Sequence, residues 1–245
     1  MKTFYATAAA VLISLAGTGM AAADDISADV LTYNGQTQVA TARGNVVIHA
    51  NEGATMTGAS GEYHFKDGSA YLTGGVHYVK GASTMNAETV HVQGDKTIYG
   101  VGGVDLYDGE GQRTIRGDQV TYNPDTGYSR VEGSGYVSAP DGSLTAPLIE
   151  GNAKEIRFTA TGGVQFESDV HQLSGSGDQA VYTKSPDAED GKVVLTGNAY
   201  AVQNGNAFRG PELIFELADN FVQTKGRSTL IITNTGSSAG DTPEE

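Results

Sequence analysis

The chain has 245 residues, with 34 glycines, no cysteine, no tryptophan and a formal net charge of −14 at pH 7. The lack of cysteine excludes a disulfide scaffold, thiolate zinc sites, iron–sulfur clusters and thiol catalysis. The acidic balance argues against a nucleic-acid partner, and a hydrophobic content of 38% argues against full disorder.

The first 23 residues have the pattern of a secretory signal peptide. Lys2 supplies a positive n-region, residues 4–16 are almost all apolar or small, and residues 21–23 are all alanine, as an A-x-A cleavage site requires. The apolar run is shorter than the ~20 residues of a membrane span. We therefore expect cleavage after Ala23 and export of a soluble chain. An uncleaved inner-membrane anchor is the alternative.

The rest of the chain repeats at a near-constant spacing. A glycine with a small or apolar residue two positions later recurs after short β runs, with gaps of 30, 28, 31, 29, 35 and 29 residues between the first glycines. We interpret these glycines as marking where strands begin, and the long gap as a loop insertion over residues 186–191. The first glycines of the seven steps are Gly44, Gly74, Gly102, Gly133, Gly162, Gly197 and Gly226.

Acidic residues recur at similar intervals. Each precedes or opens a β run, so we interpret them as a second marker of strand starts. The acids concerned are Asp29, Glu62, Glu88, Asp118, Asp178 and Glu212.

Within each unit the apolar residues alternate with period two, which places them on one face of a strand. Polar residues often stand between them, as expected of half-buried antiparallel strands. We expect these apolar residues to line the interior: Val46, Ile48, Tyr63, Phe65, Val76, Tyr78, Val90, Val92, Val104, Leu106, Val120, Tyr122, Ile156, Phe158, Val164, Phe166, Val193, Leu195, Leu213, Phe215, Leu230 and Ile232.

The sequence therefore predicts an all-β chain with two or three short strands in each ~30-residue unit. A helix is indicated only by Leu213, Leu217 and Phe221 at i, i+4 and i+8, and the repeat register favours a strand there. One unit cannot bury its apolar face alone, so stacked units must share a core. An elongated two-sheet jelly roll and a β-helix remain open. A β-barrel is disfavoured because aromatic girdles are missing.

Motifs for catalysis or metal binding are sparse. No nucleophile elbow is present, and Gly133-Ser134-Gly135 is better explained as turn and bulge glycines. The histidines lie in different units without ligand spacing, so we expect them on solvated strand faces. No metal or other cofactor is expected, and no carboxylate pair stands out for glycoside hydrolysis. The five histidines are His49, His64, His77, His91 and His171.

Three stretches resemble a known family. They are Ala28-Asp29 with Tyr33 and Gly44-Asn45-Val46, then residues 117–122, then residues 177–182 with Gly197-Asn198-Ala199. They are similar to the OstA-like repeats of the LptA/OstA-like lipopolysaccharide-transport family, which is the LptA/LptC/LptD N-domain superfamily. The resemblance extends from Asp25 to Asn234.

The resemblance implies a twisted antiparallel β jelly roll that shelters lipid A acyl chains in an apolar groove in the periplasm. It implies edge-strand pairing with LptC-like and LptD-like proteins, head-to-tail self-association and no enzyme activity. LptC-type members keep a membrane span and LptD-type members add a long barrel, so an LptA-type chain fits best. The expected domains are a signal peptide at 1–23, the jelly roll at 24–234 and a disordered acidic tail at 235–245.

Two other classes remain as alternatives. A secreted adhesin-like β-solenoid predicts a closed, dry core and no envelope partners. A carbohydrate-active β-helix predicts a cleft where Asp and Glu cluster on one sheet face.

Overall fold

The computed structural model describes residues 23–50, 53–109, 112–123, 125–152, 154–185, 187–188 and 190–233. The expected signal peptide before Ala23 and the expected acidic tail from residue 235 lie outside the described residues.

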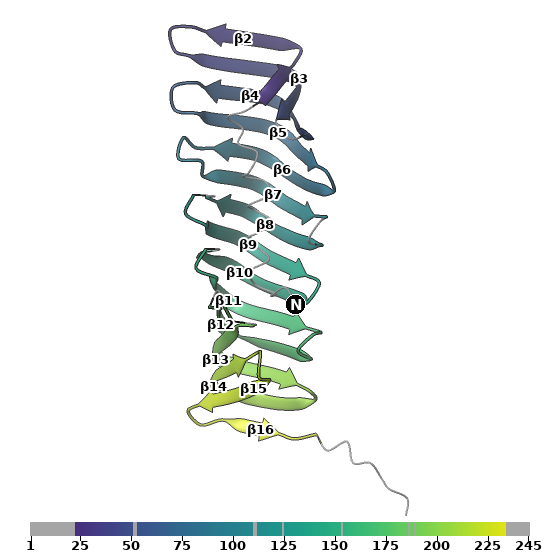
Figure 1. The fold of residues 1–245 in the computed structure, drawn as a ribbon, viewed down its shortest axis with the longest axis vertical. Helices are drawn as coiled ribbons and strands as arrows, with labels where there is room; N and C mark the ends of the chain where they lie inside the picture. Colours follow the sequence, from purple (N-terminus) through teal and green to yellow (C-terminus); the bar gives the residue numbers. More distant parts are fainter. Residues whose placement is uncertain are drawn as a thin grey trace, which may run out of the picture.

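The described chain forms one continuous antiparallel sheet, and consecutive strands stack along its long axis from the N-terminal to the C-terminal end (Figure 1). The all-β prediction is confirmed, and the helical alternative at Leu213 is replaced by a strand. The strands are β1 Ala23–Ser27, β2 Val30–Asn34, β3 Val39–Ala50, β4 Ala54–His64, β5 Ser69–Lys80, β6 Ser83–Val92, β7 Ile98–Asp108, β8 Arg113–Tyr122, β9 Tyr128–Ala139, β10 Gly142–Asn152, β11 Arg157–Ser168, β12 Leu173–Thr183, β13 Lys192–Gln203, β14 Asn206–Glu216, β15 Phe221–Lys225 and β16 Thr229–Ile231.

Each repeat holds two strands, within the predicted two or three, but the strands are long and not short as predicted. Strands β3 to β14 have 10 to 12 residues each, and the pairing register of each shifts near its middle. At each end of the sheet, two short strands take the place of one bent strand. β1 and β2 both pair with β3, and β15 and β16 both pair with β14.

Six of the seven glycine steps are corners inside strands, and not strand starts as predicted, while Gly226 lies in the break between β15 and β16. At the corner of β3, Gly44 and Asn45 have φ angles of 73° and 49°. At the corner of β5, Gly74 and Gly75 have φ angles of 84° and 74°. Two successive left-handed residues insert a β-bulge that bends the strand. Glycine takes this conformation without a Cβ penalty, which explains its recurrence.

Four of the recurring acids, Asp29, Glu88, Asp118 and Asp178, lie beside corner glycines. Asp118 on β8 faces the corner glycine Gly133 of β9, and Glu88 on β6 faces Gly102 of β7. Of the acids predicted to open strands, only Asp29 stands just before one. The spacing of the acids beside corners therefore reflects the spacing of the bends in the neighbouring strands.

The bends divide the sheet into two walls. Wall I runs from β2 to β15, and wall II runs from β1 to β16, with every strand between them contributing one half to each wall. The turns at the free edges form rim I, which includes residues 65–68, 184–185 and 190–191, and rim II, which includes residues 81–82 and 169–172. A trough thus lies between the walls, with the corners along its floor.

Candidate functional site

The inward faces of both walls form one apolar cluster that runs the length of the trough. It begins with Ala42 on β3 and continues to Leu217, just after β14. Most of the apolar residues chosen from the sequence are buried: Val46, Val76, Tyr78, Val90, Val92, Val104, Leu106, Val120, Tyr122, Phe158, Val164, Phe166, Val193, Leu195, Leu213 and Phe215.

The remaining six lie near the ends or rims. Ile48 and Ile156 are half-buried and pack against the cluster. Tyr63 is also half-buried, while Phe65 is 56% exposed in the turn after β4. Exposure is similarly high for Leu230 on the last edge strand and for Ile232 just after it, since no further strand of the described chain covers them.

The sequence analysis missed about half of the buried cluster. These residues could have been found from a second pattern. In it, a large apolar residue is paired at i+2 with alanine or glycine and not with another large residue, as in Ala70/Leu72 and Leu144/Ala146. Small residues face large ones across neighbouring strands, which lets the two walls interdigitate. The larger missed residues are Leu72, Met85, Ile115, Val131, Val137, Leu144, Ile149, Leu173, Tyr182 and Leu217.

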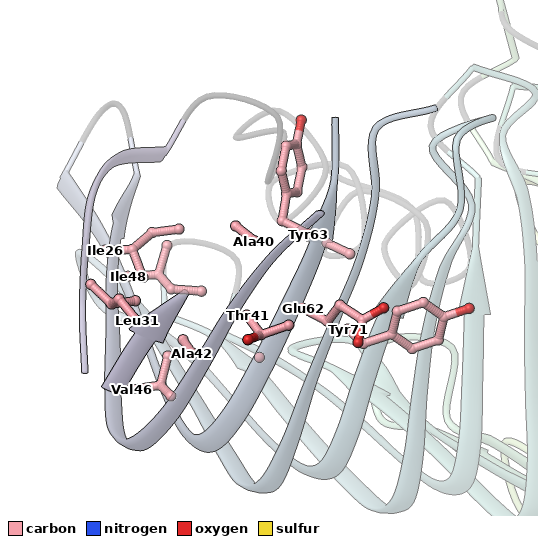
Figure 2. A pocket seen from close by; sticks show the side chains of 12 residues that line it. Ile26, Leu31, Ala40, Thr41, Ala42, Val46, Ile48, Glu62, Tyr63 and Tyr71 are labelled. Atoms are coloured by element: carbon pink, nitrogen blue, oxygen red, sulfur yellow. The ribbon is translucent and has the colours of Figure 1, made fainter. Parts of the chain in front are cut away.

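The N-terminal end of the trough is an open apolar mouth. Ile26 on β1 pairs with Ile48 on β3, and Leu31 on β2 pairs with Ala42. Figure 2 shows Ile26, Leu31 and Ile48 pointing into the same space, with Val46 deeper toward the bend. Leu31 is 53% exposed because β2 is the edge strand of wall I, and no other described strand pairs with its free side.

Aromatic rings stand on rim I at this mouth. The Phe65 ring meets the Tyr63 ring edge-on at a centroid distance of 4.7 Å, and the Tyr33 ring at 5.6 Å. Both Tyr33 and Phe65 are more than half exposed. An exposed apolar patch of this kind commonly marks an interaction surface.

The trough is closed in this conformation. The mouth pocket has a volume of about 50 Å³, well below the ~150 Å³ cavity that holds a benzene molecule. Further along, Leu72, Leu195 and Phe215 have no exposed surface. A long acyl chain can therefore enter only if the walls move apart.

The outer faces carry the charges, many of them in pairs. Arg130 on β9 contacts Glu150 at 2.6 Å and Glu132 at 2.8 Å. The hydrogen bond from Arg130 lowers the pKa of Glu132, and the same bond raises the pKa of Arg130. Lys192 and Glu216 form a similar surface pair at 2.9 Å. The trough is therefore apolar inside and acidic outside.

A row of rings crosses the outer face of wall I. His91 stacks on Tyr71 at a centroid distance of 4.0 Å and on Tyr99 at 5.6 Å. Partial burial between the rings lowers the pKa of His91. His91 lies on a strand face as predicted, and so do His49, His64 and His77, whereas His171 lies in the turn after β11 with its side chain only 14% exposed.

The described residues contain no group of three or more histidines and carboxylates that could hold a metal ion. Within the same residues, no helix has the length and apolar character that crossing a membrane requires.

Comparison with known proteins gives the family. The sequence profile of the LptA/(LptD N-terminal domain) LPS transport protein family matches residues 55–221. The chain belongs to this family. Its members are lipopolysaccharide transport proteins rather than enzymes.

The matched segment extends from the second residue of β4 to the start of β15, so it includes most of the bent strands. Among solved structures, the chain is similar to LptH of Pseudomonas aeruginosa, described as the LptA homologous periplasmic component of the lipopolysaccharide transport device. The identity is 17%, the match covers 51% of this chain and 96% of that one, and the TM-score is 0.43. No curated protein matches the sequence.

Proposed function

We propose that this protein carries lipopolysaccharide across the periplasm, with the lipid A acyl chains held between the two walls. The observation that carries the proposal is the uninterrupted apolar interior from Ala42 to Leu217. Stacked repeats need this shared core for stability, and the same inward faces would contact the acyl chains once the walls part.

Burial of the acyl chains supplies the binding energy in this account. Each methylene that leaves water contributes about 0.8 kcal/mol. Several long chains can thus be held without any polar motif. Parting the walls costs some apolar contacts of the closed form, and the acyl chains replace those contacts as they enter.

The acidity of the surface is consistent with binding through the acyl chains and not through the charged headgroup. A net charge of −14 repels the phosphates of lipid A, so attraction between charges cannot drive capture. Screening limits that repulsion to about 8–10 Å at physiological salt. The headgroup then stays in solvent near a rim, while the chains alone enter the trough.

The two ends of the sheet are the proposed contact points for LptC-like and LptD-like partners, through edge-strand pairing. Both ends have unpaired edges, formed by β1 with β2 and by β15 with β16. The chain runs from wall II to wall I through β1 and β2, and from wall I to wall II through β15 and β16. A second copy placed head to tail would continue the antiparallel order, which supports self-association.

The proposed location is the periplasm, with the signal peptide removed after Ala23. Cleavage there leaves Asp24 as the first residue, inside β1. The first edge strand would then form at the new N-terminus.

Tryptophan fluorescence tests the proposal, because the natural chain contains no tryptophan. Phe166→Trp places a single reporter on the inward face of β11, where Phe166 is 6% exposed. Tyr200→Trp is the matched control on the outer face of the same wall, where Tyr200 pairs with Arg209. Lipid A with brominated acyl chains should quench the inner reporter and spare the outer one. Equal quenching of both, or of neither, would refute acyl binding in the trough.

A further inference from the structure

The connection between β12 and β13 on rim I differs from its counterparts. It comprises residues 184–191, whereas β4 and β5 are joined by residues 65–68, and β10 and β11 by residues 153–156. This is the insertion that lengthens one repeat spacing. Asp190 and Gly191, which end it, are called the strap below.

The strap reaches the opposite rim. Asp190 Oδ2 lies 3.0 Å from Nε2 of His171, which is in the turn between β11 and β12 on rim II. His171 precedes β12 and Asp190 follows it in the chain, and an unbent strand of its eleven residues would span about 35 Å. The pair therefore crosses the trough from rim to rim. The side chains of His171 and Asp190 are only 14% and 18% exposed.

Beneath this pair, the strap covers the apolar interior. A Cβ atom on Gly191 would overlap the ring of Tyr182, an inward residue that is 2% exposed. The Gly191 carbonyl accepts a hydrogen bond from the Leu217 backbone amide at 3.0 Å. Leu217 is itself buried as part of the apolar cluster. The strap thus sits on the trough contents as well as joining the rims.

We propose that the His171–Asp190 pair is a releasable closure, and that the strap must leave His171 before acyl chains enter this part of the trough from the side. The inference rests on the proposed function, whose regulation it describes. A polar closure suits release, because both side chains regain water when the rims separate. An apolar seam of the same extent would instead expose its surface to water on every opening.

The absence of natural cysteine makes a direct test available. The double variant His171→Cys, Asp190→Cys is treated with a short bis-methanethiosulfonate crosslinker that joins the two rims and is removed by reductant. Loading is followed with fluorophore-labelled lipopolysaccharide. The matched control is His77→Cys, Asn86→Cys, which replaces a pair 2.7 Å apart on neighbouring strands of the outer face of wall II. Crosslinking there does not join the rims.

The proposal predicts that crosslinking the rims slows loading by about tenfold or more, since it removes the binding-competent open state. Reductant should restore the rate, and the crosslinked control should load normally. Unchanged loading with the rims crosslinked would overturn the proposed role of the strap as a closure, while leaving the proposed carrier function intact. If the reduced double variant and the control both fail to load, the carrier function and the strap fall together.

Discussion

The side-chain amide of Asn45 donates a hydrogen bond to the carboxylate of Asp29 across 3.0 Å. It ties the corner of β3 to the break between β1 and β2. Asn198 and Asp178 make the same connection at 3.2 Å near the other end of the sheet. The same hydrogen bond between a corner asparagine and an aspartate thus occurs near both ends of the sheet. It fixes the position of the corner relative to the neighbouring strand.

The two residues of a corner should respond differently to a methyl group. Gly74 faces Ala59 on β4, whereas a Cβ on Gly75 would meet nothing within 4 Å. Gly75→Ala should lower the free energy of unfolding by about 1–2 kcal/mol through its positive φ alone. Gly74→Ala should cost about 1–3 kcal/mol more, because the strands must shift. Urea unfolding measures both variants, and equal losses would contradict the corner geometry.

Asparagine should be accepted at the second corner position. Asn45 and Asn198 hold this position with φ angles of 49° and 50°. Asparagine tolerates the left-handed region better than alanine does. We therefore expect Gly75→Asn to be more stable than Gly75→Ala in the same urea measurement. A larger loss with asparagine would show that the second position needs glycine for another reason.

Stability should depend on the pH through His91. Its pKa in the folded protein lies below the ordinary value of 6.5, so the unfolded chain binds a proton more readily. Stability is then lost as the pH falls through about 6.5 and below. His91→Asn should weaken this fall between pH 7.5 and pH 5, as measured by thermal unfolding. His77→Asn is the control on the other wall, and an equal effect from both variants would contradict the role of the stack.

The trough interior should behave as a packed core in the absence of lipid. Leu195 has no exposed surface, so Leu195→Ala should lower the free energy of unfolding by about 2–5 kcal/mol. Leu230 is 53% exposed on the edge strand β16, and Leu230→Ala should cost far less. Chemical denaturation compares the two, and similar losses would indicate that the interior is already open.

The all-β class and about half of the inward residues could be predicted because alternation is local, as Val104 and Leu106 on β7 illustrate. The corners could not be predicted. The apolar alternation continues on both sides of the bulge at Gly102, so the glycine resembles a turn between two strands. The contact between His171 and Asp190 was out of reach for a different reason. It depends on how far β12 folds over, and no spacing in the sequence records the distance between the rims.

Photocrosslinking in cells tests the central claim most directly. Photoreactive residues at the inward positions Val76, Val104, Phe158 and Phe166 should trap lipopolysaccharide, because all four face the trough and are at most 6% exposed. Photoreactive residues at His77 and Gln165, exposed neighbours on the outer face, should trap little or none. Crosslinks to lipopolysaccharide from the outer positions alone would contradict transport inside the trough.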